Sequence, residues 1–246
     1  MSCVNTSPPE CFINPGCPDE FGCIAGVCPD FTIKRHDTMP PFKVSVEDEN
    51  GPLDLTDLIL EASMWAKAKL KKDITATDTW LQFADNIGFQ QALVGDTIVF
   101  DRVRGPEHML IIGFDETNKK VQVERAAHGT TASVWKKGTP LRVFRFISAP
   151  AVTEMVIEDI QQLDGTTLCD QLIESYLVYN WTATDTCVPG CFYLEFKLLS
   201  MDPTNLIVPS VTPECFSGVG VAWVRRFPVC GDGFLIKICD SPSAEI

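Results

Sequence analysis

The sequence predicts an all-β protein whose core is an antiparallel sheet. Residues 192–198 alternate, with Phe192, Leu194 and Phe196 on one face and polar side chains between them, which is the pattern of a half-buried strand. Turn residues recur every ~8–12 positions across residues 73–150, a spacing typical of a small all-β unit. The cysteines lie only near the two ends of the chain, so the ends differ chemically from the middle.

The composition narrows the class of protein. The chain has 246 residues, which suits one large or two small domains. Its net charge of -13, from 33 acidic and 20 basic residues, repels phosphate backbones, so we expect no nucleic-acid partner. No segment approaches ~18 uninterrupted apolar residues, so we expect no membrane insertion. The start Met1-Ser2-Cys3 lacks a charged-then-apolar leader, which predicts cytoplasmic synthesis without export.

Eleven cysteines are candidates for disulfide bonds, and their odd number leaves at least one thiol free or paired between chains. The candidates are Cys3, Cys11, Cys17, Cys23, Cys28, Cys169, Cys187, Cys191, Cys215, Cys230 and Cys239. Residues 1–30 also hold many prolines and glycines, which favours a loop-rich arm stapled by disulfides. A metal or iron–sulfur site is the weaker alternative because no Cys-x-x-Cys pair and no histidine is present there. A reduced, disordered segment is the third interpretation of residues 1–30.

Three strands are predicted between residues 31 and 72. The first covers residues 31–34, and the second follows from the alternation of Phe42, Val44 and Val46 with polar neighbours. A strong turn signal at residues 49–52 comes next. Residues 58–65 form the third strand, with a helix as the less favoured alternative.

The middle and the C-terminal part are also predicted to be strands and turns. In the middle part the strands cover residues 97–100, 109–114, 121–125 and 141–146. Residues 154–160 fit a strand or a helical turn. Two strands then flank the turn between Asp185 and Gly190, and a last strand covers residues 234–238 after a proline-rich stretch.

The two ends of the chain together resemble the immunoglobulin-like N-terminal domain of phage upper-baseplate proteins. The resemblance is carried by Phe31-Thr32-Ile33-Lys34, Asp37-Thr38-x-Pro40-Pro41, the turn and strand from Asn50 to Trp65, Tyr179-x-Trp181-Thr182-x-x-Asp185-Thr186, Pro189-Gly190-x-x-Tyr193-x-Glu195-Phe196, Phe227-Pro228 and Phe234-x-Ile236-x-Ile238. It implies an immunoglobulin-like antiparallel sandwich made of residues 31–72 plus 151–246, in which Phe42 and Phe196 share one interior. Residues 73–150 would be a small β-barrel or sandwich inserted into one loop, since long insertions cost little closure entropy.

The insert resembles a short β module that recurs in phage tail fibre and baseplate proteins. Its pattern is Arg125-x-x-x-Gly129-Thr130-x-Ala132 followed by Gly138-Thr139. The cysteines are additions to the family pattern. Cys187 and Cys191 bracket a turn and would close a small loop, whereas Cys230 and Cys239 would staple the last hairpin. Intermolecular bonds from the arm at residues 1–30 are a further hypothesis, which non-reducing electrophoresis of particles tests.

No catalytic, cofactor-binding or metal-ligating residue is predicted. His36, His108 and His128 lie in unrelated segments, and no phosphate-cradling or nucleophile motif is present. The acidic stretch from Asp159 to Asp170 is better explained as a solvated face than as a calcium loop. Trp181 is expected to fill a sandwich core rather than stack on a ligand.

The resemblance implies a non-enzymatic structural protein of a phage tail, in the baseplate or at a fibre attachment point. We expect it to be made in the host cytoplasm, to reside in the virion, and to assemble as a symmetric homo-oligomer with other tail proteins, without any cofactor. Two alternatives stay open. One is a host-glycan-binding module, which exposed tryptophans such as Trp80 or Trp135 would favour, and the other is a capsid decoration protein.

Overall fold

The computed structural model describes residues 29–48, 50–101, 105–200, 223–228 and 233–239. The predicted all-β character is confirmed, because strands dominate the described residues. The strands are β1 (Phe31–Lys34), β2 (Phe42–Ser45), β3 (Glu47–Asp48), β4 (Gly51–Pro52), β5 (Leu58–Lys69), β6 (Trp80–Leu81), β7 (Thr97–Phe100), β8 (Glu107–Asp115), β9 (Lys120–Ala127), β10 (Pro140–Pro150), β11 (Val152–Gln161), β12 (Thr167–Tyr179), β13 (Gly190–Ser200), β14 (Trp223–Phe227) and β15 (Phe234–Cys239). Among these residues no helix is long and apolar enough to cross a membrane.

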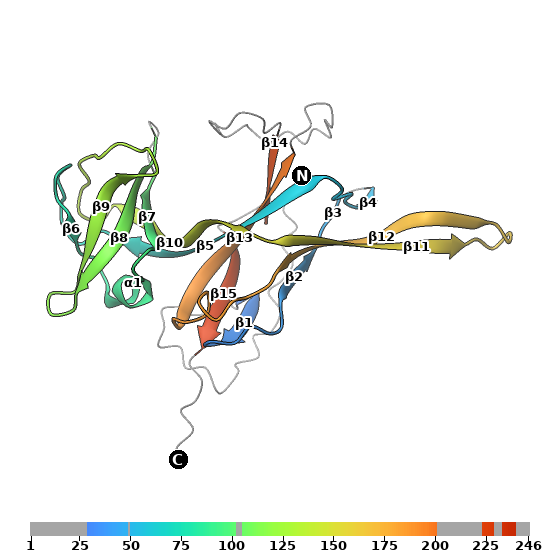
Figure 1. Ribbon diagram of the computed structural model, residues 1–246, viewed down its shortest axis with the longest axis horizontal. Coiled ribbons are helices and arrows are strands. Elements are labelled where there is room, and N and C mark those ends of the chain that lie inside the picture. The colour runs from blue at the N-terminus through green and yellow to red at the C-terminus, as the bar shows by residue number, and fades with distance from the viewer. Residues whose placement is uncertain (1–28, 49, 102–104, 201–222, 229–232, 240–246) are drawn as a thin grey trace, which may run out of the picture.

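The largest sheet of the described residues has ten strands and continues from β1 and β15 into the region of β6 to β9 (Figure 1). Its order is β1-β15-β13-β5-β10-β7-β8-β9-β6, with β14 also paired to β13. The expectation of a purely antiparallel sheet is wrong at one edge, where β1 pairs with β15 in parallel. Parallel pairing needs a long crossover, and the roughly 200 residues between these strands supply one.

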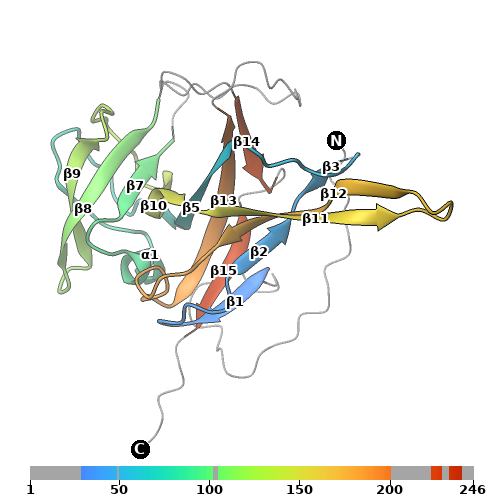
Figure 2. The same cartoon turned by 45° about the vertical axis from the view of Figure 1, so that its right-hand side comes forward.

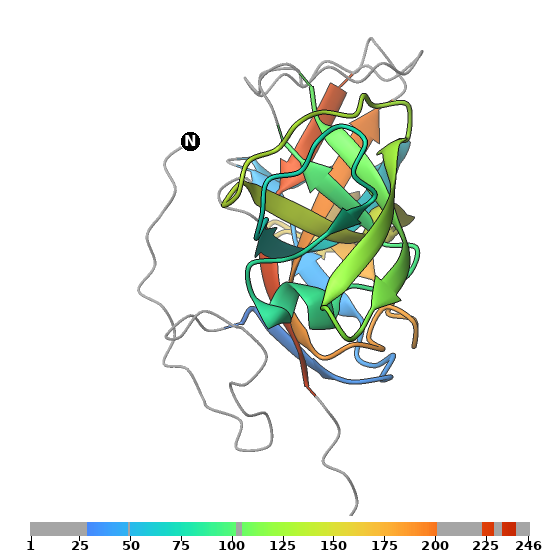
Figure 3. The same ribbon diagram turned by 90° about the vertical axis from the view of Figure 1, so that its left-hand side faces the viewer.

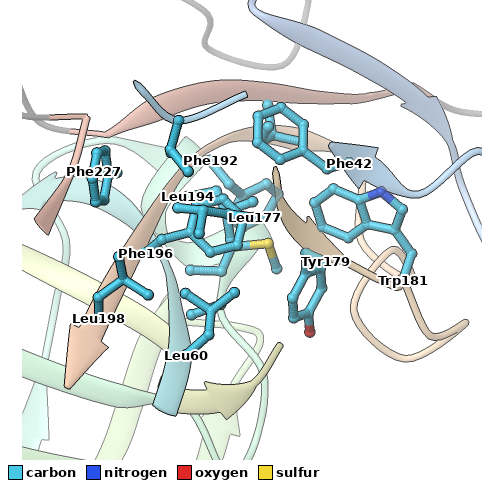
Figure 4. Close-up of a cluster of buried hydrophobic side chains, with 14 of the residues drawn as sticks. Phe42, Leu60, Leu177, Tyr179, Trp181, Phe192, Leu194, Phe196, Leu198 and Phe227 are labelled. Atoms are coloured by element: carbon cyan, nitrogen blue, oxygen red, sulfur yellow. The ribbon is translucent and has the colours of Figure 1, made fainter. Parts of the chain in front are cut away.

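A second sheet, with the order β11-β12-β2, packs across the first over a common apolar core. The core draws side chains from both ends of the chain (Figure 4). The rings of Phe42 and Phe196 stack at 5.9 Å between centroids and 15° between planes, so the prediction that they share one interior is confirmed. Trp181 is 4% exposed in the same core, as predicted.

The alternation in β13 explains why this strand lies at the centre of the core. Its apolar set, Phe192, Leu194, Phe196 and Leu198, is at most 1% exposed. The opposite face is half-buried at Tyr193, Glu195 and Lys197. Both edges of β13 are paired as well, with β15 and β14 along one edge and β5 along the other, so the strand lies inside the sheet.

A second apolar core lies within residues 68–143 and is built from β5 to β10 (Figure 3). The long strands β5 and β10 pair with each other from Pro140 to Pro150 and contribute to both cores. Along β5 the buried side chains pass from the first core to the second between two residues: Ala66 belongs to the first core and Ala68 to the second. The inserted region is therefore a continuation of the main sheet that carries its own core.

Two local features differ from the sequence-based expectations. A short helix, α1 (Asn86–Gln91), lies in the middle region, where only strands and turns were predicted. Asp85 caps it by accepting a hydrogen bond from Gly88 N at 2.9 Å, and a Cβ at Gly88 would lie 3.0 Å from Ala68 Cβ, so glycine permits the close approach to β5. The helical alternative for residues 58–65 is wrong, since β5 pairs on both sides with β10 and β13.

Candidate assembly site

The hairpin of β11 and β12 projects from the body as a long arm (Figures 1 and 2). Only residues 176–179 of β12 pair with β2, so the hairpin has no neighbouring described strand beyond that point. We call residues 157–172 the arm. Ile157 lies opposite Leu172 and Ile160 opposite Leu168, and the exposed fractions of Ile157, Ile160 and Leu168 are 55%, 42% and 42%. A two-stranded ribbon that exposes apolar pairs and both strand edges is a template for association.

The arm is also strongly acidic. It carries Glu158, Asp159, Asp164 and Asp170, all exposed, and no lysine, arginine or histidine. The predicted solvated face between Asp159 and Asp170 is confirmed. Leu163 at the tip is fully exposed. An apolar ribbon with charges of one sign is suited to a partner surface of the opposite sign.

The motif residues around Asp185 form a buried polar network that joins the two ends of the chain. Asp185 accepts hydrogen bonds from Tyr179 Oη at 2.9 Å and from Thr182 N at 2.8 Å. Burial and the Asp185 carboxylate raise the pKa of Tyr179, which keeps the phenol protonated as the donor. Thr186 Oγ1 donates to Asp37 O at 3.0 Å, which ties the 181–187 loop to the N-terminal strands.

Arg125, the first residue of the middle motif, forms a buried ion pair with Glu107. Its Nε donates to Glu107 Oε1 at 2.7 Å, and the two side chains are 7% and 1% exposed. Glu107 Oε2 also accepts from Ser133 N at 2.9 Å and from Trp135 Nε1 at 2.6 Å. Arg125 donates further to the backbone oxygens of Thr75, Asp78 and Ser133. The motif thus fixes the 126–135 loop, because both carboxylate oxygens of Glu107 accept hydrogen bonds from it or from Arg125.

Arg145 on β10 links the two cores. Its Nη1 donates to Asp185 O at 3.0 Å in the first core region, and its Nη2 donates to Gln91 O at 2.9 Å at the end of α1. Its Nε lies 3.6 Å from Asp96 Oδ1, and both side chains are 5% exposed. One guanidinium therefore joins α1 to the 181–187 loop and holds the arm-bearing body against the inserted region.

Asp96 makes this junction sensitive to pH. Burial raises the pKa of Asp96 to about 6, against the opposing effect of Arg145. A raised pKa means that the folded state binds the proton more tightly, so the contribution of Asp96 to stability is complete below pH ~4 and is lost as pH rises through 6. Relative to Asp96→Asn, we expect the free energy of unfolding of the unmodified chain to fall by about 2–3 kcal/mol from pH 4 to 7. Urea unfolding across this range measures it.

The matched control is Asp115→Asn at the end of β8. Hydrogen bonds from Asn118 lower the pKa of Asp115, so its stabilising effect is lost on acidification and the pH trend has the opposite sign. Parallel pH profiles for the unmodified chain and Asp96→Asn would contradict the assignment to Asp96.

Two of the histidines meet, although the sequence placed them in unrelated segments. The rings of His108 and His128 lie 5.6 Å apart, and His128 Nε2 is 3.3 Å from Thr97 Oγ1. Burial and the neighbouring His128 lower the pKa of His108. The sequence could have predicted this proximity, because the predicted hairpin of β8 and β9 places His108 opposite Ala127, the residue before His128. Within the described ranges, no group of three or more histidine, cysteine or carboxylate side chains could hold a metal ion.

The four described cysteines are in two different chemical states. Cys169 and Cys187 carry free thiols, so the predicted loop closure between Cys187 and Cys191 is wrong. Cys191 and Cys239 are buried on β13 and β15 and are disulfide-bonded. The candidates Cys3, Cys11, Cys17, Cys23, Cys28, Cys215 and Cys230 lie outside the described residues. The cysteine-rich N-terminal segment is therefore described only at residues 29 and 30, and the predicted Cys230–Cys239 bond stays a prediction.

The two tryptophans named for glycan binding differ in exposure. Trp80 on β6 is 41% exposed. Trp135 is only 4% exposed, since it stacks on Phe100 at 4.6 Å and donates to Glu107. Trp135 therefore belongs to the second core, so it gives no support to the glycan-binding alternative.

Comparisons with known proteins add no relative to this picture. No protein-family model matches the chain, and no curated protein matches it. The projecting arm and the linked cores are therefore the features from which a function must be argued.

Proposed function

We propose that this chain is a non-enzymatic structural component of a phage tail, in the baseplate or at a fibre attachment point, and that it assembles with other virion proteins through the arm. In this role the immunoglobulin-like sandwich of residues 31–72 plus 151–246 forms the body. The inserted module of residues 73–150 forms a second contact region.

The arm is the observation that carries the proposal. A ribbon that exposes Ile157, Ile160, Leu163 and Leu168 to water gains stability when a partner covers it, because burial of apolar surface is favourable. The strand β11 extends about 13 Å beyond Ile157, because each of the four steps from residue 157 to residue 161 rises about 3.3 Å. A binding element of this shape suits an assembly built from extended mutual contacts.

The resemblance to upper-baseplate and tail-fibre proteins supplies the biological setting. The residues that carry the resemblance make structural contacts. Thr186 donates a hydrogen bond to Asp37, Arg125 forms an ion pair with Glu107, and Phe196 stacks on Phe42. Such positions stabilise a fold, so they support the family likeness of the body and insert without assigning them any chemistry.

Locating the protein in particles tests the proposal. Antibody labelling of purified particles is expected to mark the tail. Labelling of the head would favour a capsid decoration protein, and particles free of the protein would overturn a structural role.

Shortening the arm should remove incorporation without unfolding the protein. Replacing residues 159–170 by Asn-Gly joins Glu158 to Gln171, which are paired directly, through a two-residue turn suited to a hairpin. The removed side chains are exposed, so we expect the free energy of unfolding to change by less than about 1 kcal/mol. The fraction of chain that cosediments with particles should fall to background.

A matched control shortens a different hairpin. Replacing residues 116–119 by Asn-Gly joins the paired residues Asp115 and Lys120 of β8 and β9. This variant should be incorporated normally. Equal incorporation of both variants would show that the arm is dispensable for assembly.

Host-glycan binding is the second candidate, favoured by the exposure of Trp80. Exposed indole rings stack on the apolar faces of sugars, whereas buried ones do not. A glycan array probed with the full chain, and again with Trp80→Ala, separates this function from the structural one. Loss of a specific glycan signal in Trp80→Ala would favour it.

A further inference from the structure

Six exposed lysines gather where β5 ends in the inserted module, in a chain that has only 20 basic residues against 33 acidic ones. They are Lys67, Lys69, Lys71, Lys72, Lys136 and Lys137, and we call them the lysine patch. Backbone hydrogen bonds from Leu70 N to Thr139 O and from Gly138 N to Leu70 O bring the two segments together. Asp73 lies among them and binds Lys136 Nζ at 2.9 Å.

The patch and the arm have opposite charge and lie at opposite ends of the molecule. The inserted module and the β11–β12 hairpin project away from each other in two views (Figures 1 and 2). The arm of one molecule therefore does not reach its own lysine patch. A second copy of the chain, however, can bring its lysine patch to the arm.

We infer that the acidic arm of one copy docks on the lysine patch of a second copy, in a head-to-tail contact. The inference rests on the proposed assembly role of the arm and names its partner. Lysine ammonium groups would face Glu158 and Asp170 of the arm, while exposed Val134 beside the patch offers an apolar contact to the arm. A head-to-tail contact joins different surfaces, so it yields a ring if the rotation closes and a filament if it does not.

Salt should weaken the contact, since the charged groups on both sides are exposed and separated charges are screened over about 10 Å at 0.1 M salt. We expect the full chain, with free thiols alkylated to prevent cysteine cross-links, to self-associate in sedimentation analysis at low salt. The dissociation constant should rise at least about tenfold as salt increases from 0.05 to 0.5 M.

Charge reversal on either surface provides the decisive test. The arm variant Glu158→Lys/Asp170→Lys and the patch variant Lys71→Glu/Lys72→Glu should each weaken self-association at least about tenfold, since like charges then face each other. A mixture of the two variants should associate again. The unmodified arm of the patch variant can bind the unmodified patch of the arm variant, and the reversed arm can bind the reversed patch. The control Lys34→Glu/Lys119→Glu makes the same change in net charge as the patch variant, at exposed lysines outside the patch, and should self-associate like the unmodified chain.

The outcomes separate this inference from the proposed function. A chain that stays monomeric at about 100 μM in low salt, or a mixture of reversed variants that fails to associate, overturns the head-to-tail contact. Tail labelling and the arm-shortening experiment are independent of that result. If the tail is labelled while the chain alone is monomeric, the arm binds a different virion protein.

Discussion

Glu107→Ala is expected to lower the free energy of unfolding by about 3–5 kcal/mol. The substitution leaves the guanidinium of Arg125 buried without its carboxylate and removes the acceptor of Ser133 N and Trp135 Nε1. The unpaired charge and donors then bear their full desolvation cost. Urea unfolding followed by circular dichroism measures the loss, and Trp135 fluorescence reports it from within the network.

Two further variants identify the cause. Glu116→Ala removes the carboxylate of an exposed pair with Lys119 and should cost less than about 1 kcal/mol. The double variant Glu107→Met/Arg125→Met removes both charges and should recover much of the loss, since a buried ion pair can be replaced by apolar side chains at little cost. If Glu107→Ala is as mild as Glu116→Ala, the network does not hold the module together.

The sequence was sufficient to predict most strands because their signals are local. The alternation at residues 192–198 corresponds directly to the buried and half-buried faces of β13. The apolar run at residues 109–114 lies within β8, and the turn that follows it leads into β9 as predicted. In each case the period of the side chains, rather than any distant contact, determines the structure.

The features that were missed depend on contacts far apart in the chain. Helix α1 is short and contains Gly88, so its local helical signal is weak, and its close approach to Ala68 decides the outcome. The parallel pairing of β1 with β15 joins residues about 200 positions apart. Trp135 lies outside the predicted strands, yet its indole is buried, where it donates a hydrogen bond to the carboxylate of Glu107.

The same reasoning applies to the candidate site. The acidic stretch from Asp159 to Asp170 was correctly predicted to be solvated, but its place at the end of a projecting ribbon follows from β2 pairing only with residues 176–179. The lysines at positions 67–72 and 136–137 are far apart in sequence and become one patch only through the backbone bonds of Leu70. The charge count alone therefore indicates only an acidic chain, whereas the fold places acidic residues on the arm and lysines on a separate patch.

Phe196→Ala should be the other large loss, about 3–5 kcal/mol of unfolding free energy. Phe196 is fully buried and its ring contacts Phe42 from β2 and Phe234 from β15, so the substitution opens a cavity between strands from opposite ends of the chain. The cavity cannot close by a local shift, because three separate elements line it. Thermal and urea unfolding should both show the loss.

A double-mutant cycle shows whether the two ends truly share one core. Phe42→Leu and Phe196→Leu remove the stacked pair and should be non-additive by about 0.5–1.5 kcal/mol, the coupling typical of aromatic pairs. A control cycle combines Phe196→Leu with Phe100→Leu. Phe100 is as buried as Phe196 but stacks on Trp135 in the second core. Phe196→Leu and Phe100→Leu should add to within about 0.5 kcal/mol because the two residues lie in different cores. Additivity in the first cycle would mean that Phe42 and Phe196 are not packed together in solution, and the discontinuous body would then lose its basis.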